Sequence, residues 1–225
     1  MKVLAFGKDN SQGRATLFLH GFPGVRSKQN RDLAERAAIE KGRRTYAPLY
    51  TGLGFSEGEF SFVKCRDEVY DFAAKLFRDN ERVDLVGHSW GGYLSLGLAA
   101  KYQERVETLV LMSPLLNFFT LDICQQAFSL TAKDSSILTL GDTDERAREF
   151  HKLGNQEKAT DFARAISPQT KVTLFQAATD ATTPASYAEA LVNQFQIRPR
   201  YEVVPTDHSF LEHRKQALTQ VLTAL

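Results

Sequence analysis

Short apolar runs alternate with amphipathic stretches along most of the chain. Stretches with apolar residues at helical spacing predict helices over Gln29–Lys41, Lys64–Arg78, Trp90–Tyr102, Pro184–Phe195 and Phe210–Leu225. The short apolar runs predict strands over Val3–Phe6, Thr16–Leu19, Arg44–Ala47, Arg82–Val86, Thr108–Met112, Val172–Gln176 and Arg200–Val204. This alternation predicts an α/β fold with a mostly parallel central sheet and helices on both faces.

One segment interrupts the alternation. From Leu115 to Ile166 the composition stays partly apolar and contains helix-forming charged runs such as Asp144–Lys152, but no strand pattern is found. A segment of this length is too long for an ordinary loop in a compact domain. We therefore predict a helical insertion over residues 115–166, with residues 1–114 and 167–225 forming the core.

Composition and charge restrict the class of protein. The 225 residues are 43% hydrophobic and 24% charged, which is typical of a folded globular domain. Lys and Arg total 28 against 27 for Asp and Glu, so the formal net charge is +1. Bulk charge therefore gives no support to a nucleic-acid partner or to an acidic membrane surface.

The cysteines and the apolar runs bear on where the protein works. Cys65 and Cys124 are the only cysteines, too few for a disulfide framework, and we expect both to be reduced thiols. The first apolar stretch ends at Lys8, which is short for a signal peptide, and runs such as Leu109–Met112 are far below the ~18 residues that span a bilayer. We expect a cytoplasmic protein with no membrane insertion.

The strongest chemical motif is Gly87-His88-Ser89-Trp90-Gly91, which lies directly between a predicted strand and a predicted helix. In that context Gly-x-Ser-x-Gly forms a tight turn that exposes the serine, and the two glycines give room where the strand and the helix approach each other. A serine hydroxyl becomes a nucleophile when a neighbouring base takes its proton. The motif therefore makes Ser89 a candidate nucleophile.

Four features in this order resemble the α/β-hydrolase family, and in particular its small esterases, lipases, thioesterases and serine peptidases. They are the segment His20–Gly24 after an early strand, the Ser89 motif, Asp180 after a late strand and His208 after the last strand. The family's chain order is nucleophile, acid and histidine. The resemblance also implies a cap domain inserted before the strand that precedes the acid, which is where residues 115–166 fall.

Each catalytic role also has a chemical argument. His208 follows a predicted strand that ends at a proline, so its ring should hang from a loop at the sheet edge where Ser89 emerges, and it is the candidate base; the alternative is a surface loop histidine. Asp180 would hold the tautomer of His208, although it could instead cap a helix. Asp207 is adjacent to His208 and is interpreted as a loop aspartate.

Acyl transfer also needs donors for the developing oxyanion. The residue after the nucleophile normally gives one backbone amide, which here is Trp90. The segment His20–Gly24 resembles the family's oxyanion loop, whose donor position corresponds to Phe22. Pro23 has no N–H, so the second donor is Phe22 or Gly21.

The remaining histidines and acids are interpreted as structural. We expect His20 to orient its loop, His88 to pack beneath the turn, and His151 and His213 to be solvated. No metal-ligand spacing such as His-Glu-x-x-His occurs, so no metal is implied. The acids of the insertion are expected at solvated helix ends, and these are Asp122, Asp134, Asp142 and Asp144.

The glycine-rich segment Gly52–Gly58 superficially resembles a phosphate-binding loop. It lacks the following helix start and the lysine of such a loop, so we reject nucleotide binding and expect no cofactor. In the family a comparable loop begins with an acidic residue. Here Leu49 or Tyr50 stands at that position, which departs from the family pattern.

The leading hypothesis is a serine hydrolase that cleaves a small-molecule carboxylic ester, with a small or medium apolar or aromatic acyl group, through an acyl-enzyme on Ser89. Phe118, Phe119 and Phe128 are candidates for the substrate pocket, although phenylalanines in a helical segment are more often core residues. A thioesterase or a serine aminopeptidase or amidase would use the same residues, and a non-catalytic ligand-binding protein is a further alternative. Dehalogenase and epoxide-opening chemistry is disfavoured because both reactions use an aspartate where Ser89 stands.

Overall fold

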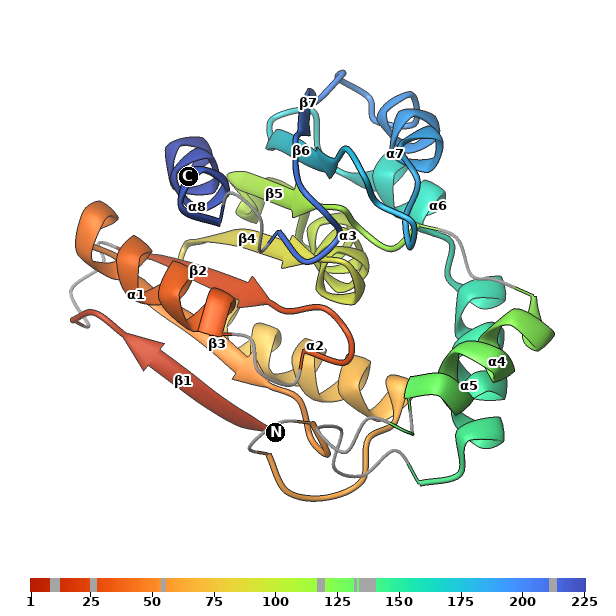
Figure 1. The fold of residues 1–225 in the computed structure, drawn as a ribbon. Helices are drawn as coiled ribbons and strands as arrows, with labels where there is room; N and C mark the ends of the chain where they lie inside the picture. The colour runs from red at the N-terminus through yellow and green to blue at the C-terminus, as the bar shows by residue number, and fades with distance from the viewer. Residues whose placement is uncertain are drawn as a thin grey trace.

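A central sheet of mostly parallel strands organises the fold (Figure 1). The computed structural model describes residues 1–8, 13–24, 28–53, 56–116, 120–131, 133, 141–210 and 214–225. In these residues seven strands form one sheet in the order β1-β3-β2-β4-β5-β6-β7. Strands β2 to β7 are parallel to one another, and β1 pairs antiparallel with β3. The bounds are β1 (Lys2–Phe6), β2 (Arg14–Leu19), β3 (Arg44–Leu49), β4 (Arg82–His88), β5 (Thr108–Met112), β6 (Lys171–Ala177) and β7 (Arg200–Val204).

Helices cover both faces of the sheet, which confirms the predicted fold class (Figure 1). One buried cluster joins α1 and α8 to one face, and a larger cluster joins α2, α3, α6 and α7 to the other. The bounds are α1 (Lys28–Lys41), α2 (Phe62–Asp79), α3 (Trp90–Tyr102), α4 (Leu121–Thr131), α5 (Thr143–Gln156), α6 (Ala159–Ala165), α7 (Ala185–Val192) and α8 (Arg214–Ala224). A short 3₁₀ helix covers Gln103–Arg105.

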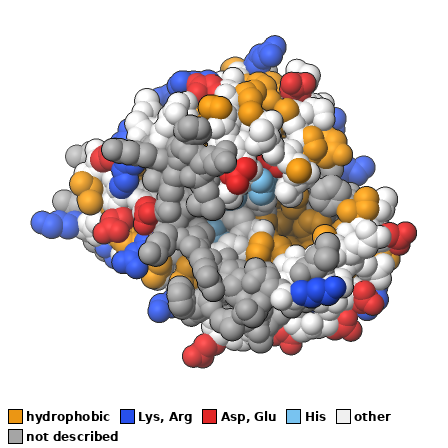
Figure 2. Space-filling model, viewed as in Figure 1, with side chains coloured by type: hydrophobic (Ala, Val, Ile, Leu, Met, Phe, Trp, Pro, Cys, Tyr) orange, Lys and Arg blue, Asp and Glu red, His pale blue; other side chains and the backbone are white. Residues whose placement is uncertain are grey.

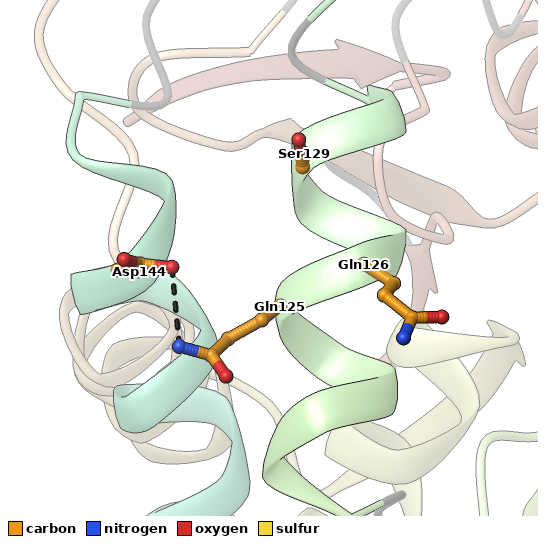
Figure 3. A pocket seen from close by; sticks show the side chains of 4 residues that line it. All are labelled: Gln125, Gln126, Ser129 and Asp144. Carbon is orange, nitrogen blue, oxygen red and sulfur yellow. Dashed lines mark hydrogen bonds between the residues drawn. The ribbon is translucent and has the colours of Figure 1, made fainter.

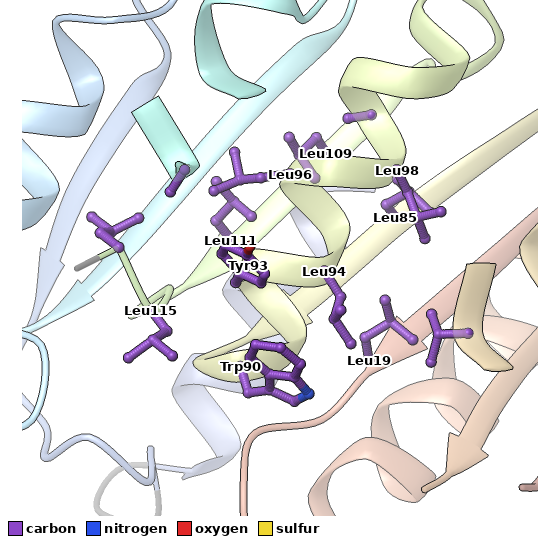
Figure 4. Packing of buried hydrophobic residues seen from close by; sticks show 14 of the residues in the cluster. Leu19, Leu85, Trp90, Tyr93, Leu94, Leu96, Leu98, Leu109, Leu111 and Leu115 are labelled. Carbon is purple, nitrogen blue, oxygen red and sulfur yellow. The ribbon is translucent and has the colours of Figure 1, made fainter. Parts of the chain in front are cut away.

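Helix α3 lies at the centre of the larger cluster. Its residues from Trp90 to Ala99 are all buried, and leucines of α3 pack against Leu85 of β4 and Leu109 of β5 (Figure 4). A helix that is apolar on every side is stable only when it is enclosed. The sequence of α3 therefore fixes it between the sheet and the surrounding helices, directly after Ser89.

Several predicted ends differ from those in the structure, and the largest differences are in the last two helices. The predicted start of the last helix at Phe210 is wrong, because Phe210 has a φ of +53° in the left-handed region and α8 begins at Arg214. Helix α7 begins after Pro184 and ends at Val192, short of the predicted Phe195. Strand β4 runs on to His88 because it keeps pairing with β5 up to that residue.

The interval predicted to be a helical insertion contains α4, α5 and α6, and its described residues contain no strand. Helices α4 and α5 pack against each other and stand beyond the sheet, and α5 contacts α2 (Figure 1). Helix α6 packs against α3 and α7 instead. This interval therefore has a projecting helix pair and a segment that returns to the layer of α3.

A buried polar junction ties α5 to the start of α2. The carboxylate of Glu149 on α5 accepts hydrogen bonds from the amides of Phe62 at 3.1 Å and Val63 at 3.2 Å, and from the hydroxyl of Ser61, the N-cap of α2. The buried Arg146 donates to Glu149 Oε2 at 3.0 Å and to the Phe60 carbonyl at 3.2 Å. A carboxylate at free helix-start amides also interacts favourably with the helix dipole.

Neither cysteine forms a disulfide and both are buried, as expected for reduced thiols. Cys65 accepts a hydrogen bond from Trp90 Nε1 at 3.5 Å. Burial raises the pKa of the Cys65 thiol well above its usual value. Within the described part of the chain, none of the helices has the length and apolar character needed to cross a bilayer.

The Glu149 junction can be tested by mutation. Glu149→Ala leaves the Phe62 and Val63 amides without their acceptor, so it should lower the free energy of unfolding by roughly 1–3 kcal/mol. Glu145→Ala removes an exposed partner of the same arginine and should cost less than about 1 kcal/mol. Urea unfolding followed by the fluorescence of Trp90, the sole tryptophan, measures both. Equal losses in the two variants would contradict the assignment of the junction.

Candidate active site

The candidate residues come from four segments that meet at one edge of the sheet. The His20–Gly24 segment follows β2, Ser89 follows β4, Asp180 follows β6 and His208 follows β7. Because these four strands are parallel, their carboxyl ends share an edge, which is where ligands bind in open α/β sheets. Residues far apart in the sequence are thereby brought to one place.

Ser89 occupies a strained turn between β4 and α3. Its φ is +51° and its ψ is −116°, a conformation that costs a non-glycine residue about 1–3 kcal/mol. The surrounding chain holds it there, since its amide donates to the Met112 carbonyl at 3.0 Å and its carbonyl accepts from the Leu115 amide at 2.9 Å. Its side chain is mostly buried, with the residue 5% exposed.

The two glycines of the motif are required by close approach. A Cβ on Gly91 would lie 2.1 Å from the Leu19 carbonyl oxygen of β2, and one on Gly87 would lie 2.4 Å from Ser95 Oγ. Both separations are far below van der Waals contact. The glycines therefore let β2, β4 and α3 converge at Ser89.

Asp180 and His208 form a close pair. His208 Nδ1 lies 2.7 Å from Asp180 Oδ2, and the carboxylate also accepts from the amides of Thr182 at 2.9 Å and Thr183 at 2.7 Å and from Thr183 Oγ1 at 2.8 Å. Burial alone would raise the Asp180 pKa, but the hydrogen bonds from His208 and the Thr183 amide outweigh it and lower that pKa well below its usual value. Asp180 is therefore a carboxylate that orients the imidazole.

Ser89 and His208 lie near each other but are not joined by a hydrogen bond. The Ser89 hydroxyl forms no hydrogen bond with any residue that the structure describes. The His208 ring is nevertheless close to the turn, because its centroid lies 5.1 Å from that of His88, the neighbour of Ser89. Hydrogen bonds of this kind are often long before substrate binds and tighten in the complex.

Free amides surround the serine. Among the described residues, the backbone N–H groups of Trp90, Gly21 and Phe22 have no hydrogen-bond partner. Trp90 is the first residue of α3, so its amide points out of the positive end of the helix dipole. A Cβ on Gly21 would lie 3.0 Å from Ser89 Cβ, which places this loop against the serine.

His20 is buried and uncharged, consistent with the orienting role expected of it. Its Nδ1 donates to the Gly21 carbonyl at 2.7 Å, and its ring stacks on Tyr50 with centroids 3.8 Å apart. Burial lowers the pKa of His20 to about 4. The Tyr50 hydroxyl donates to the His20 carbonyl at 2.9 Å, a contact that the sequence did not reveal.

His88 packs beneath the turn, as expected. Burial, followed by the positive charge of His208, lowers the pKa of His88 to about 3. Its Nε2 lies 2.7 Å from the His208 carbonyl oxygen. No motif signalled this contact, because it joins residues 120 positions apart.

The remaining residues interpreted as structural take no part in the Asp180–His208 contact, as far as the structure describes them. The Asp207 carboxylate accepts from Ser209 Oγ at 2.7 Å within its own loop, as expected of a loop aspartate. Asp142 caps the start of α5 and lies with Asp144 and Asp122 at exposed helix starts, and His151 is half-buried on α5. Asp134 and His213 lie outside the described residues, as do Gly54 and Phe55 of the glycine-rich segment.

Aromatic side chains extend from the Phe22 loop toward the insertion. Phe128 of α4 lies 5.5 Å from Phe22 and 5.3 Å from Phe62 between ring centroids, and it is 5% exposed. It is therefore part of a packed cluster. Phe118 and Phe119 lie outside the described residues. Figure 2 shows a hollow in this face of the molecule with histidine and hydrophobic side chains side by side.

A separate shallow groove of about 470 Å³ lies between α4 and α5 (Figure 3). Gln125 donates to Asp144 Oδ1 there at 3.2 Å, and the other lining residues are Gln126 and Ser129. None of the candidate catalytic residues lines this groove. Among the described residues, no three His, Cys, Asp or Glu side chains gather closely enough to hold a metal ion.

Comparison with known proteins points to one family. A family model described as alpha/beta hydrolase fold matches residues 16–131. A 2-hydroxymuconate semialdehyde hydrolase of Pseudomonas sp. (strain CF600) is 37% identical over 107 residues, and a 2-hydroxy-6-oxo-2,4-heptadienoate hydrolase of Pseudomonas putida (strain F1) is 36% identical over 112. Each match covers 46% of this chain and 38% of the relative, so the likeness spans well under half of the relatives' length.

Solved structures share the whole fold at low sequence identity. An esterase from Exiguobacterium antarcticum has a TM-score of 0.76 at 18% identity, covering 98% of this chain and 93% of that one. A lipase-esterase related protein from Clostridium acetobutylicum has a TM-score of 0.73 at 19% identity, covering 100% and 99%. These likenesses concern the fold alone.

The two buried histidines predict a loss of stability in mild acid. The unfolded chain binds protons on His20 and His88 near pH 6.5, but the folded chain binds them only near pH 4 and pH 3. The free energy of unfolding should therefore fall as the pH drops from 6.5 toward 4, by up to roughly 1.4 kcal/mol per pH unit for each group.

Urea unfolding between pH 7 and pH 5 measures this slope. His88→Gln removes one of the two groups and should therefore flatten the slope. The carboxylate of Asp180 does not interfere, because its contribution is lost only below about pH 4. The same slope in the parent and in His88→Gln would contradict the prediction.

Proposed function

The chain belongs to the α/β-hydrolase family, and from this premise we propose that it is a serine hydrolase that cleaves carboxylic esters through an acyl-enzyme on Ser89. The observation that carries the proposal is the 2.7 Å contact between His208 Nδ1 and Asp180 Oδ2 beside the strained Ser89 turn. A carboxylate, an imidazole and a serine in this order are the groups that acyl transfer requires. Asp180, His208 and Ser89 are accordingly proposed as acid, base and nucleophile.

In the first half of the reaction, His208 Nε2 takes the proton of the Ser89 hydroxyl as the oxygen attacks the ester carbonyl. Asp180 holds the Nδ1 proton and stabilises the imidazolium that forms. The negative charge on the former carbonyl oxygen is accepted by the amide of Trp90 and by that of Phe22 or Gly21. The imidazolium then gives its proton to the departing alcohol, and the acyl group stays on Ser89.

In the second half, His208 takes a proton from a water molecule, which attacks the acyl carbonyl. The same amides receive the charge, and the imidazolium returns its proton to Ser89 as the acid leaves. The amides need no reorganisation at either step, because the turn and the helix start already hold them in place.

The acyl group is proposed to be small or medium and apolar or aromatic. The Phe22 ring lies 5.0 Å from Phe60 and 5.1 Å from Phe62 between centroids, so the loop of the proposed oxyanion donor continues into an apolar wall. Phe128 and Phe150 add to this wall from α4 and α5. We propose that residues 115–166 act as the cap, with α4 and α5 over the acyl side and α6 as the return to the core.

A second candidate rests on the curated relatives. Two of them are named for hydrolysis of 2-hydroxymuconate semialdehyde and of 2-hydroxy-6-oxo-2,4-heptadienoate, at 37% and 36% identity over part of the chain. An unsaturated hydroxy-oxo acid is therefore a second class of substrate for the same residues. Thioesters and amides remain alternatives for the same reason, because the fold does not choose the bond.

The Ser89 assignment makes a direct prediction. Ser89→Ala should lower kcat for p-nitrophenyl esters by at least about 1000-fold and lose labelling by a fluorophosphonate, because it removes the nucleophile. Ser129→Ala, which changes an exposed serine of α4, should keep both. Labelling that persists in Ser89→Ala would refute the assignment.

Rates measured on several compounds with the parent protein distinguish the proposed substrate classes. Values of kcat/KM are compared for p-nitrophenyl esters of increasing chain length, one matched thioester, one aminoacyl anilide and 2-hydroxy-6-oxo-2,4-heptadienoate. The ester proposal requires the highest value on an ester. A higher value on the dienoate would replace it with the second candidate, and no turnover of any compound would favour the ligand-binding alternative.

The choice of acid is tested by two neighbouring aspartates. Asp180→Asn should lower kcat by about 10⁴-fold, because the amide no longer holds the required tautomer of His208. Asp207→Asn changes the carboxylate that bonds only within its loop and should keep kcat within about threefold. Steady-state kinetics on one ester measures both. A larger loss in Asp207→Asn than in Asp180→Asn would exchange the two roles.

A further inference from the structure

The His88 ring makes a directed contact with the main chain of the candidate base. Its Nε2 lies 2.7 Å from the His208 carbonyl oxygen, and a carbonyl can only accept, so Nε2 carries the hydrogen and donates it. This bond spans 120 residues and connects the end of β4 to the loop after β7. The residue next to the candidate nucleophile therefore holds the residue that would activate it.

The surroundings of His88 leave its ring little freedom. Phe210 meets it edge to face with centroids 5.8 Å apart, and a Cβ on Gly21 would lie 3.2 Å from its Nδ1. The ring thus fills the space between the loop after β2 and the loop after β7. The Nε2–H group of His88 is therefore held pointing at the His208 carbonyl.

Over the residues described, the loop after β7, which carries His208, makes few other main-chain hydrogen bonds to the rest of the protein. Before His208, Thr179 donates from its amide and its hydroxyl to the Thr206 carbonyl at 3.2 Å and 3.0 Å. Within the described residues from 207 to 210, the His208 carbonyl is the only main-chain group hydrogen-bonded outside the loop. Its orientation consequently depends on His88.

We propose that His88 is a positioning residue for His208: its Nε2–H fixes the main chain of the base while Asp180 fixes the ring, and together they aim the imidazole at Ser89. This proposal rests on the proposed function for its kinetic consequence. Asp180 alone fixes one ring atom and leaves the ring free to swing about it. The second anchor, at the backbone, removes that freedom.

Three substitutions separate this role from simple packing. The amide nitrogen of His88→Gln can reach the place of Nε2, whereas that of His88→Asn reaches only the place of Nδ1, and His88→Phe keeps a ring without a donor. For an ester, kcat should fall about tenfold or more in the Asn and Phe variants with KM within about twofold, the size expected for one hydrogen bond. His88→Gln should recover kcat to within about threefold of the parent.

A second readout needs no substrate. The proton between His208 Nδ1 and Asp180 should give a low-field NMR signal, assigned by its loss in Asp180→Asn. The signal should remain in His88→Gln and broaden or vanish in His88→Asn and His88→Phe. Because it does not depend on turnover, it tests the positioning role even if esters prove not to be substrates.

Two results would overturn the positioning role of His88. Equal kcat in His88→Gln and His88→Phe, with the NMR signal kept in both, would overturn the proposal. A change confined to KM would also overturn it, because the base would then be positioned correctly without His88. Should His88→Phe fail to fold, His88→Asn carries the same comparison with a smaller polar side chain.

Discussion

The close approach of β2, β4 and α3 at the Ser89 turn is the constraint on which the rest of the site depends. Only glycine fits at positions 87 and 91, because a Cβ would meet the Ser95 hydroxyl or the β2 backbone. The same convergence forces Ser89 to a φ of +51° and leaves the Trp90 amide free at the helix start. A strained serine beside unpaired donors is thus a consequence of packing, and hydrogen bonds from Ser89 to Met112 at the end of β5 and from Leu115 to Ser89 hold it in place.

Around this turn, the site is assembled by hydrogen bonds between loops that the parallel sheet brings to one edge. The hydrogen bonds from His208 and from the Thr183 amide keep Asp180 ionised, and the carboxylate holds one side of the His208 ring. The buried His20 and His88, in contrast, both stay neutral and act as fixed hydrogen-bond donors to main-chain carbonyls. Among these three side chains only Asp180 carries charge, and it lies next to the proposed base.

Local patterns predicted the strands, the fold class and the order of the candidate residues. The strand of Thr108–Met112 and the helix of Trp90–Tyr102 begin and end at the predicted residues. In both, the apolar part of the sequence matches the extent of the element. Contacts between distant residues carried no such signal. The Tyr50–His20 bond and the Glu149 junction join positions 30 and 87 apart, and Phe210 leaves the helical region because of its turn with Asp207.

A crystal structure of the protein after reaction with a fluorophosphonate would show whether Ser89 is the nucleophile and His208 its base, because the adduct resembles the tetrahedral species of ester hydrolysis. We expect continuous density from Ser89 Oγ to phosphorus, a phosphoryl oxygen within about 3 Å of the Trp90 amide and of the Phe22 or Gly21 amide, and His208 Nε2 facing the serine oxygen. An adduct on another residue, or a His208 ring turned away from the bonded Ser89 oxygen, would contradict these two roles.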